Sequence, residues 1–197
     1  PDKVLFGDTH LHTKLSPDAG LIGTTLSADE AYRFARGETV ISNTGQPVQL
    51  VRPLDFLVVT DHAEYIGLAP MIQNADPTFL ADPFGRWMYE QFNSGPKGRM
   101  AAFSRLIEGA NKTPPVNEMS SNEAMKNIWE SFVKTADEYD DPGTFSAMTG
   151  FEWSSLPNGN NLHRVVVFGD GADKTSQTLP FSLFDSTNPE DLWKYLA

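Results

Sequence analysis

Short apolar segments that run into histidines and acids are the feature that most constrains the fold of this chain. Three such segments lie at 4–6, 56–59 and 145–149, and a fourth, at 165–168, follows closely after a histidine. Continuous apolar runs are typical of strands covered on both faces, as in a parallel sheet. Sites in α/β folds collect at the carboxyl ends of strands. We therefore expect these polar residues to gather at one edge of a sheet.

Helix signals lie between these segments. Pairs that favour the start of a helix occur at three places: Ser27 with Glu30, Ser120 with Glu123, and Asn188 with Pro189. Strands that alternate with helices predict an α/β architecture. Two other stretches break the alternation. Residues 40–50 predict a hairpin, and residues 74–118 predict an insertion with a helix near Arg99 to Glu108 that carries substrate specificity.

Composition narrows the class of protein further. The chain has 197 residues, no cysteine and a net charge of −11. Without cysteine, any metal must be held by His, Asp and Glu rather than by thiolates. No basic stripe indicates a nucleic-acid partner, and no apolar run approaches the roughly 18 residues of a membrane span. Localisation stays open between cytoplasm and periplasm on this evidence.

His10 and His12 follow the first apolar segment. Residues two apart on a strand point to the same side, roughly 6.5–7 Å apart along the chain. Strand twist can bring two such imidazoles onto one ion, each with a ring nitrogen at about 2.0–2.1 Å. The alternative is two partly exposed histidines with no ligand. The position at a strand's carboxyl end favours the metal site.

Asp61 and His62 follow the second segment. In a regular strand they point to opposite faces, so His62 suits a metal ligand and Asp61 suits a residue that orients one. A helix start with an incidental neighbour is the alternative for this pair. Glu64 is close enough in sequence to reach the same pocket.

Glu152 and His163 flank the last two segments. A carboxylate directly after an apolar strand is costly to bury without a cation or hydrogen-bond donors, and it can bridge two ions. An exposed loop acid is the alternative. His163 precedes its strand, so it lies at the opposite end of a parallel sheet unless it enters the site from a bend near 159–161.

Together these residues resemble the PHP family, named for polymerase and histidinol phosphatase domains. The matching pattern is His10, His12, a third ligand six residues on at Asp18, then Asp61-His62, Glu152 and His163. The third ligand is often His in that family, and Asp18 replaces it here. Stretches 6–12 and 53–64 resemble an under-characterised bacterial branch whose members are typically longer and often exported. That likeness favours a periplasmic or secreted protein.

The resemblance implies a distorted seven-stranded β/α barrel of which residues 1–197 supply roughly the first four strands, with 74–118 over one end. It implies up to three divalent ions, Zn or Mn with Fe as a further option. His10, His12 and Glu152 would bind the first, Glu152 and His163 the second, and Asp18 and His62 the third. The family adds a further His and a later Asp-x-His. No histidine follows His163, so we expect the rest of the domain on a longer chain and incomplete metal binding by this one.

The implied reaction is hydrolysis of a small anionic ester, a phosphoester first, by metal-activated water. Asp61 is the candidate orienting or proton-handling residue. Three alternatives stay open. One is a hydrolase of the amidohydrolase type, which shares His-x-His but differs in its later ligands. The others are hydrolysis of sulfate esters or amides by the same metal cage, and a non-catalytic metal-binding domain.

Overall fold

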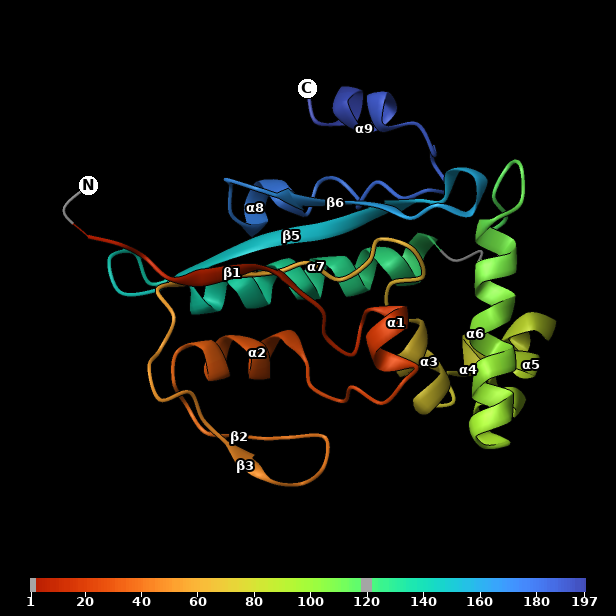
Figure 1. The fold of residues 1–197 in the computed structure, drawn as a ribbon, viewed down its shortest axis with the longest axis horizontal. Helices are drawn as coiled ribbons and strands as arrows, with labels where there is room; N and C mark the ends of the chain where they lie inside the picture. The colour runs from red at the N-terminus through yellow and green to blue at the C-terminus, as the bar shows by residue number, and fades with distance from the viewer. Residues whose placement is uncertain (1–2, 118–121) are drawn as a thin grey trace.

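A curled four-stranded sheet forms the centre of a mixed α/β fold (Figure 1). The computed structural model describes residues 3–117 and 122–197. The strands are β1 (Gly7–Leu11), β4 (Phe56–Val59), β5 (Ser146–Ser155) and β6 (Leu162–Val167), in the order β1-β4-β5-β6. The first two contacts in this order, β1 with β4 and β4 with β5, are parallel. The carboxyl ends of these three strands therefore meet at one edge, as the sequence predicts.

The last strand corrects the expectation of a fully parallel sheet. β6 runs antiparallel to β5, with Ser155 opposite Leu162 and Gly150 opposite Val167. Only residues 156–161 connect the two strands. A parallel crossover needs a dozen residues or more, so this connection permits only an antiparallel pair. His163 consequently lies beside the carboxyl end of β5, although it sits near the start of its own strand.

The first strand begins later than the apolar segment suggests. Val4, Leu5 and Phe6 lie before β1 and are 70%, 57% and 52% exposed. β1 is an edge strand in the described sheet, and most of its residues are exposed. The prediction of a strand buried on both faces is therefore wrong for this segment.

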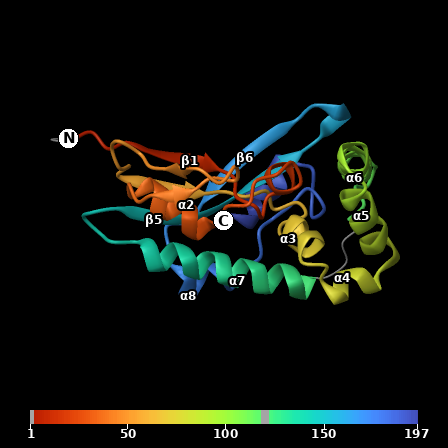
Figure 2. The ribbon, with the colours of Figure 1, turned by 90° about the horizontal axis from the view of Figure 1, so that it is seen from below.

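Two helices, α2 (Ala28–Ala35) and α7 (Asn122–Tyr139), pack with the sheet to form the main core. In Figure 2, α7 runs along the sheet on the side opposite the N-terminal strand. α2 has the predicted capping box, in which Ser27 and Glu30 hydrogen-bond with each other's backbone. The second predicted box includes Ser120, which lies outside the described residues. The largest buried core side chains are Trp129, Trp153, Tyr32 and Phe151.

A second group of helices lies at the strand ends (Figures 1 and 2). It comprises α1 (Pro17–Gly20), α3 (Leu68–Gln73), α4 (Pro77–Ala81), α5 (Pro83–Asn93) and α6 (Pro96–Ala110). These helices share a separate core that includes Leu68, Ile72, Met88, Ala102 and Leu106. The helix expected near 99–108 is α6, which extends further at both ends. The two cores meet where the polar strand ends lie.

Short elements complete the described fold. β2 (Val40–Ile41) and β3 (Pro47–Val48) pair antiparallel where the sequence predicts a hairpin. A 3-10 turn, η1 (Pro157–Gly159), sits in the β5–β6 connection, and α8 (Ala172–Thr175) and α9 (Pro189–Tyr195) follow β6. Asn188 caps α9 by accepting from the backbone N–H of Glu190. Among the described residues, no helix combines the length and the apolar character needed to cross a membrane.

Trp129 tests the main core. Its side chain is fully buried, and its indole N–H donates to the carbonyl of Thr175 at 3.1 Å. We expect Trp129→Ala to lower the free energy of unfolding by about 3–5 kcal/mol, measured by urea denaturation. Trp193, which is 60% exposed on α9, supplies the matched control. Trp193→Ala should change stability by less than about 0.5 kcal/mol. Equal losses in the two variants would contradict this description of the core.

Candidate metal centre

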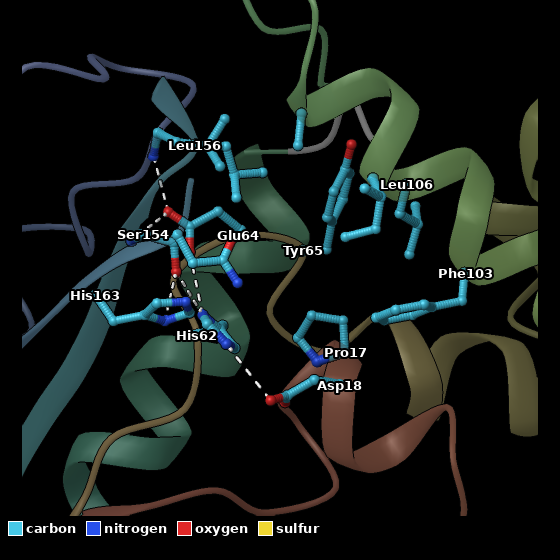
Figure 3. A pocket seen from close by; sticks show the side chains of 14 residues that line it. Pro17, Asp18, His62, Glu64, Tyr65, Phe103, Leu106, Ser154, Leu156 and His163 are labelled. Atoms are coloured by element: carbon cyan, nitrogen blue, oxygen red, sulfur yellow. Dashed lines mark hydrogen bonds and ion pairs between the residues drawn. The ribbon is translucent and has the colours of Figure 1, made fainter. Parts of the chain in front are cut away.

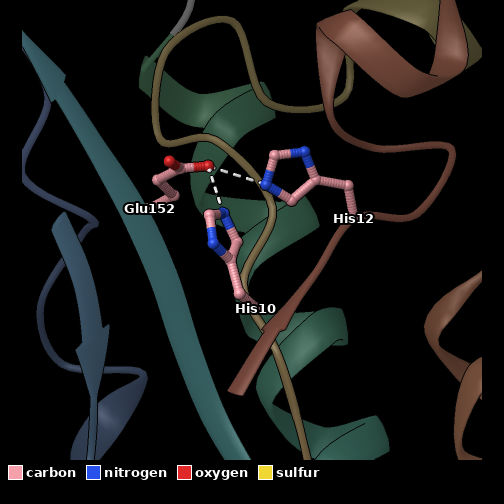
Figure 4. A group of neighbouring side chains, drawn as sticks. All are labelled: His10, His12 and Glu152. Atoms are coloured by element: carbon pink, nitrogen blue, oxygen red, sulfur yellow. Dashed lines mark hydrogen bonds and ion pairs between the residues drawn. The ribbon is translucent and has the colours of Figure 1, made fainter. Parts of the chain in front are cut away.

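His10 and His12 come from the end of β1 and converge on one carboxylate (Figure 4). Nε2 of His10 lies 3.0 Å from Oε2 of Glu152, and Nε2 of His12 lies 2.7 Å from the same oxygen. The register between β1 and β4 shifts between Asp8 and Leu11, where β1 gains one residue relative to its partner. Such a bulge re-aims the side chains beside it. The His-x-His pair thus reaches the predicted place on an irregular strand end.

Glu152 stands at the centre of the cluster and is 1% exposed. Side chains alternate along β5, so Phe151 and Trp153 enter the main core while Glu152 points to the other face. β4 ends at Val59, and Glu152 lies beyond the last β4–β5 pair. This offset leaves its carboxylate open to residues that follow the neighbouring strands.

His62 and Asp18 close one side of the cluster. Nε2 of His62 lies 3.5 Å from a carboxylate oxygen of Asp18 and 3.5 Å from Oε2 of Glu152. Asp18 also lies 3.0 Å from Nδ1 of His12. The hydroxyl of Ser16 donates to Asp18 at 2.7 Å and accepts from the backbone N–H of His62 at 3.2 Å. Ser16 therefore ties α1 to the end of β4.

His163 closes the other side from β6. Its Nδ1 lies 2.5 Å from Oε1 of Glu152, the oxygen that His10 and His12 leave free. The hydroxyl of Ser154 lies 3.3 Å from His163 and 2.9 Å from Nδ1 of His62. The antiparallel turn therefore brings His163 to the cluster, as a bend near 159–161 was expected to do. The six residues predicted as ligands all lie in this one cluster.

Three overlapping groups in the cluster could each hold an ion, with ligand atoms within 4.8 Å of one another. They are His10/His12/Glu152, His12/Asp18/His62 and His62/Glu152/His163. The first and third share only Glu152, whose two oxygens face different histidines. The second group borrows an imidazole from each of the others. Two three-ligand sites bridged by Glu152 therefore use every histidine once. A third ion would have Asp18 as its only ligand not shared with the other two sites.

The histidines and carboxylates of the cluster stabilise one another's charged forms. Burial would lower the pKa of His12, but hydrogen bonds with Asp18 and Glu152 outweigh it and raise the pKa to about 9. Burial likewise opposes the charge on His62, yet Asp18 and Glu64 raise its pKa to about 10. Burial would raise the pKa of Glu152, but its histidine partners lower it to about 2. The pKa of Asp18 is lowered in the same way, against burial, by His12 and His62.

The donor set fits a divalent cation. A carboxylate as buried as Glu152 requires compensating positive charge. Every ion pair of Glu152 within the described part of the chain is with a histidine, and no Lys or Arg supplies that charge. Imidazole and carboxylate ligands together suit Zn, Mn or Fe. The described His, Glu and Asp groups could therefore hold a metal ion.

Asp61 lies beside the cluster and contacts the backbone and side chain of Thr13, the residue after His12. It is 1% exposed, and its two oxygens accept from the backbone N–H of Thr13 at 2.5 Å and from the hydroxyl of Thr13 at 2.7 Å. Burial raises the pKa of Asp61 to about 6, against the lowering effect of these hydrogen bonds. Thr13 follows His12 directly. The geometry thus favours an orienting role for Asp61 over direct proton handling.

Glu64 and Ser154 also contact His62, and only Glu64 was among the residues considered from the sequence. Oε1 of Glu64 accepts from the backbone N–H groups of Ser154 and Leu183, at 3.2 and 2.8 Å, and Oε2 lies 3.4 Å from Nδ1 of His62. The hydroxyl of Ser154 contacts the same ring nitrogen. Glu64 was close enough in sequence to be considered. Ser154 could have been found by strand alternation, since it shares a face with Glu152.

The family model described as "Protein of unknown function (DUF3604)" matches residues 1–197, and the chain belongs to that family. Comparisons with curated proteins and with solved structures found no match.

Metal binding to this cluster should release protons. At pH 7, His12 and His62 carry a proton in the metal-free protein, because their pKa values are raised to about 9 and 10. Ligating imidazoles must be neutral. We expect Zn²⁺ binding at pH 7 to release about two protons, measured by titration calorimetry in buffers of different ionisation enthalpy. His12→Gln should remove about one of them. Release of no proton would contradict the raised pKa values.

The same pKa shifts determine how the stability of the metal-free protein changes with pH. The raised pKa values of His12 and His62 add stability that is complete below about pH 6.5 and is lost as pH rises through 9 and 10. The lowered pKa of Glu152 adds stability that is present above 4.5 and is lost as pH falls toward 2. Metal affinity has the opposite pH dependence. It increases as pH rises from 6 to 9, because the histidines lose the protons that compete with the metal.

Asp61→Asn tests the supporting role of this residue. Asparagine keeps the shape but offers one acceptor oxygen to the two donors of Thr13. We expect a folded variant whose Zn²⁺ affinity falls by about tenfold or more, measured by competition with a chromophoric chelator. Asp55→Asn is the matched control, since Asp55 accepts from Phe6 and Lys3 at the other end of β4. An Asp61 variant with unchanged affinity would contradict the role.

Proposed function

We propose that this chain carries the metal centre of a metal-dependent hydrolase of PHP type, and that its substrates are phosphoesters. The observation that carries the proposal is the buried Glu152 with a histidine on each side of its carboxylate. A carboxylate in that position can bridge two ions, and paired ions suit displacement at a phosphoryl group. The PHP type implies a β/α barrel. The parallel strands β1, β4 and β5 support this part of the proposal, because their carboxyl ends all contribute ligands.

The residues divide into two sets. His10, His12 and Glu152 would hold one ion, and Glu152 with His62 and His163 a second. A bound divalent ion would supply Lewis acidity and acidify a water near neutral pH. The side chain of Asp18, which is 43% exposed, borders the solvent side of the cluster and can accept a hydrogen bond from water that enters. Glu64 keeps the imidazole of His62 oriented, and Asp61 acts indirectly by holding Thr13, the residue after His12.

Electrostatics explain why an anion would come to an acidic protein. The chain has a net charge of −11, and anionic esters are repelled by its surface as a whole. Two divalent ions would bring four positive charges to neutral imidazoles and the two carboxylates of the cluster, Glu152 and Asp18, which leaves a local excess of positive charge. The attraction is therefore confined to the metal centre, which makes binding of an anionic ester metal-dependent.

The test is a hydrolysis assay on the metal-loaded chain. We expect hydrolysis that stops on chelation, measured as phosphate release from phosphomonoesters and as release of the alcohol from phosphodiesters. In Glu152→Gln, we expect loss of both bound metal and turnover, because the amide is a poor bridging ligand. Glu138→Gln makes the same chemical change at an exposed site on α7 and should keep both.

Three other results would overturn the proposal in different ways. Turnover of sulfate esters or amides without turnover of phosphoesters would keep the metal cage and replace the substrate class. Full metal content with no turnover on any ester or amide would indicate a non-catalytic metal-binding domain. Absence of bound metal in the unmodified chain, by elemental analysis, would remove the basis of the proposal altogether.

A further inference from the structure

A pocket opens beside the cluster, and most of its wall is apolar (Figure 3). One side is formed by Asp18, His62 and His163 of the cluster. Tyr65, Phe103 and Leu106 lie across the pocket from His163, and Leu156 and Leu183 add apolar surface beside Ser154 and Glu64. The metal ligands and the apolar wall therefore face the same space. A ligand that reaches the cluster through this pocket would place the atoms next to its reacting group against that wall.

α6 presents one continuous apolar face to this space. Phe103, Leu106, Ile107 and Ala110 line the pocket and are spaced three, four and seven residues apart, which is one side of a helix. Leu106 and Ala110 are buried, and Leu106 belongs to the second core. That core fixes the wall, because Leu106 packs in it together with Met88 and Ala102.

Tyr65 forms part of the wall at a strained position. Its φ is 56°, in the left-handed region that a bulky residue rarely adopts. Its ring is buried against Phe184, with centroids 4.9 Å apart, and its hydroxyl donates to the carbonyl of Val116 at 3.3 Å. Strained backbone positions concentrate at ligand-binding sites, where the surrounding structure fixes them. The strain here holds an aromatic ring beside the metal ligands.

The charge and size of the pocket limit the ligand. No Lys or Arg is among the described residues that line it, so beyond the histidines of the cluster no cationic side chain would pair with a second anionic group. Sugar hydroxyls placed against the apolar wall would lose their hydrogen bonds to water. The pocket has a volume of about 190 Å³. A cavity of about 150 Å³ holds a benzene ring, so one ring or a short branched alkyl group fits.

From this juxtaposition we infer that the hydrolase takes esters of an apolar alcohol, with a single aryl or compact alkyl group bound between α6 and the cluster. That the substrate is an ester rests on the proposed function. That its alcohol is apolar rests on the pocket alone. It assigns substrate selection to Phe103 and Ile107, which reach the pocket from a segment that supplies no metal ligand.

The test compares phenylphosphonate with methylphosphonate, two non-hydrolysable anions that differ only in the apolar group. On the Zn-loaded chain, calorimetry should show phenylphosphonate binding tighter on the order of 10- to 100-fold. Phe103→Ala and Ile107→Glu should each reduce that ratio at least threefold. Ile107 is 41% exposed, so its variant should fold even if Phe103→Ala does not. Met100→Ala, at a 65% exposed site on the same helix, should leave the ratio unchanged.

A second measurement separates failure of the pocket from failure of the proposed function. Equal affinity for the two phosphonates, or a phenyl preference that survives both pocket variants, would overturn the inference and leave the hydrolase proposal standing. Binding of neither phosphonate would count against the hydrolase. Toluene on the metal-free chain, followed by saturation-transfer NMR, would then decide the pocket. A signal lost in Ile107→Glu but kept in Met100→Ala supports it, and no signal overturns it.

Discussion

The charge of Glu152 is the constraint on which the site depends. A carboxylate that is 1% exposed is costly unless positive charge surrounds it, and the chain supplies that charge only through imidazoles in the described cluster. Without metal, protons on His12 and His62 serve this purpose, as their raised pKa values indicate. A metal ion would replace those protons. The same arrangement thus stabilises the metal-free fold and leaves it ready to exchange protons for cations.

The backbone brings this cluster together with few residues. Parallel β1, β4 and β5 end at one edge and deliver His12, His62 and Glu152 there. The connection at 156–161 reverses the chain and adds His163 from β6. α1 contributes Asp18, held by Ser16. Each ligand therefore depends on local strand geometry, while their mutual distances depend on the sheet register.

Some of this was visible in the sequence, and the limits have physical causes. Apolar runs ending in His or Glu predicted that His10, His12, His62 and Glu152 gather, because strand ends in parallel sheets meet. Asp18 was predicted only from the family resemblance. The direction of β6 was predicted wrongly, because an apolar run does not specify whether its neighbour is parallel. The short connection before His163 held that information. The partners of Asp61 and Glu64 were not predictable, since Thr13 and the backbone of Leu183 reach them through tertiary packing alone.

Helix α6 adds a feature that neither the strands nor the metal ligands determine. Its apolar face rests on a core separate from the sheet core, and the pocket lies between the two. Changes in Phe103 or Ile107 can therefore alter the pocket without disturbing Glu152 and its histidines. Conversely, the bridging position of Glu152 leaves little freedom, because its two oxygens already face opposite sides of the cluster. The structure thus separates a centre that is held together by charge from a wall that is held by apolar packing.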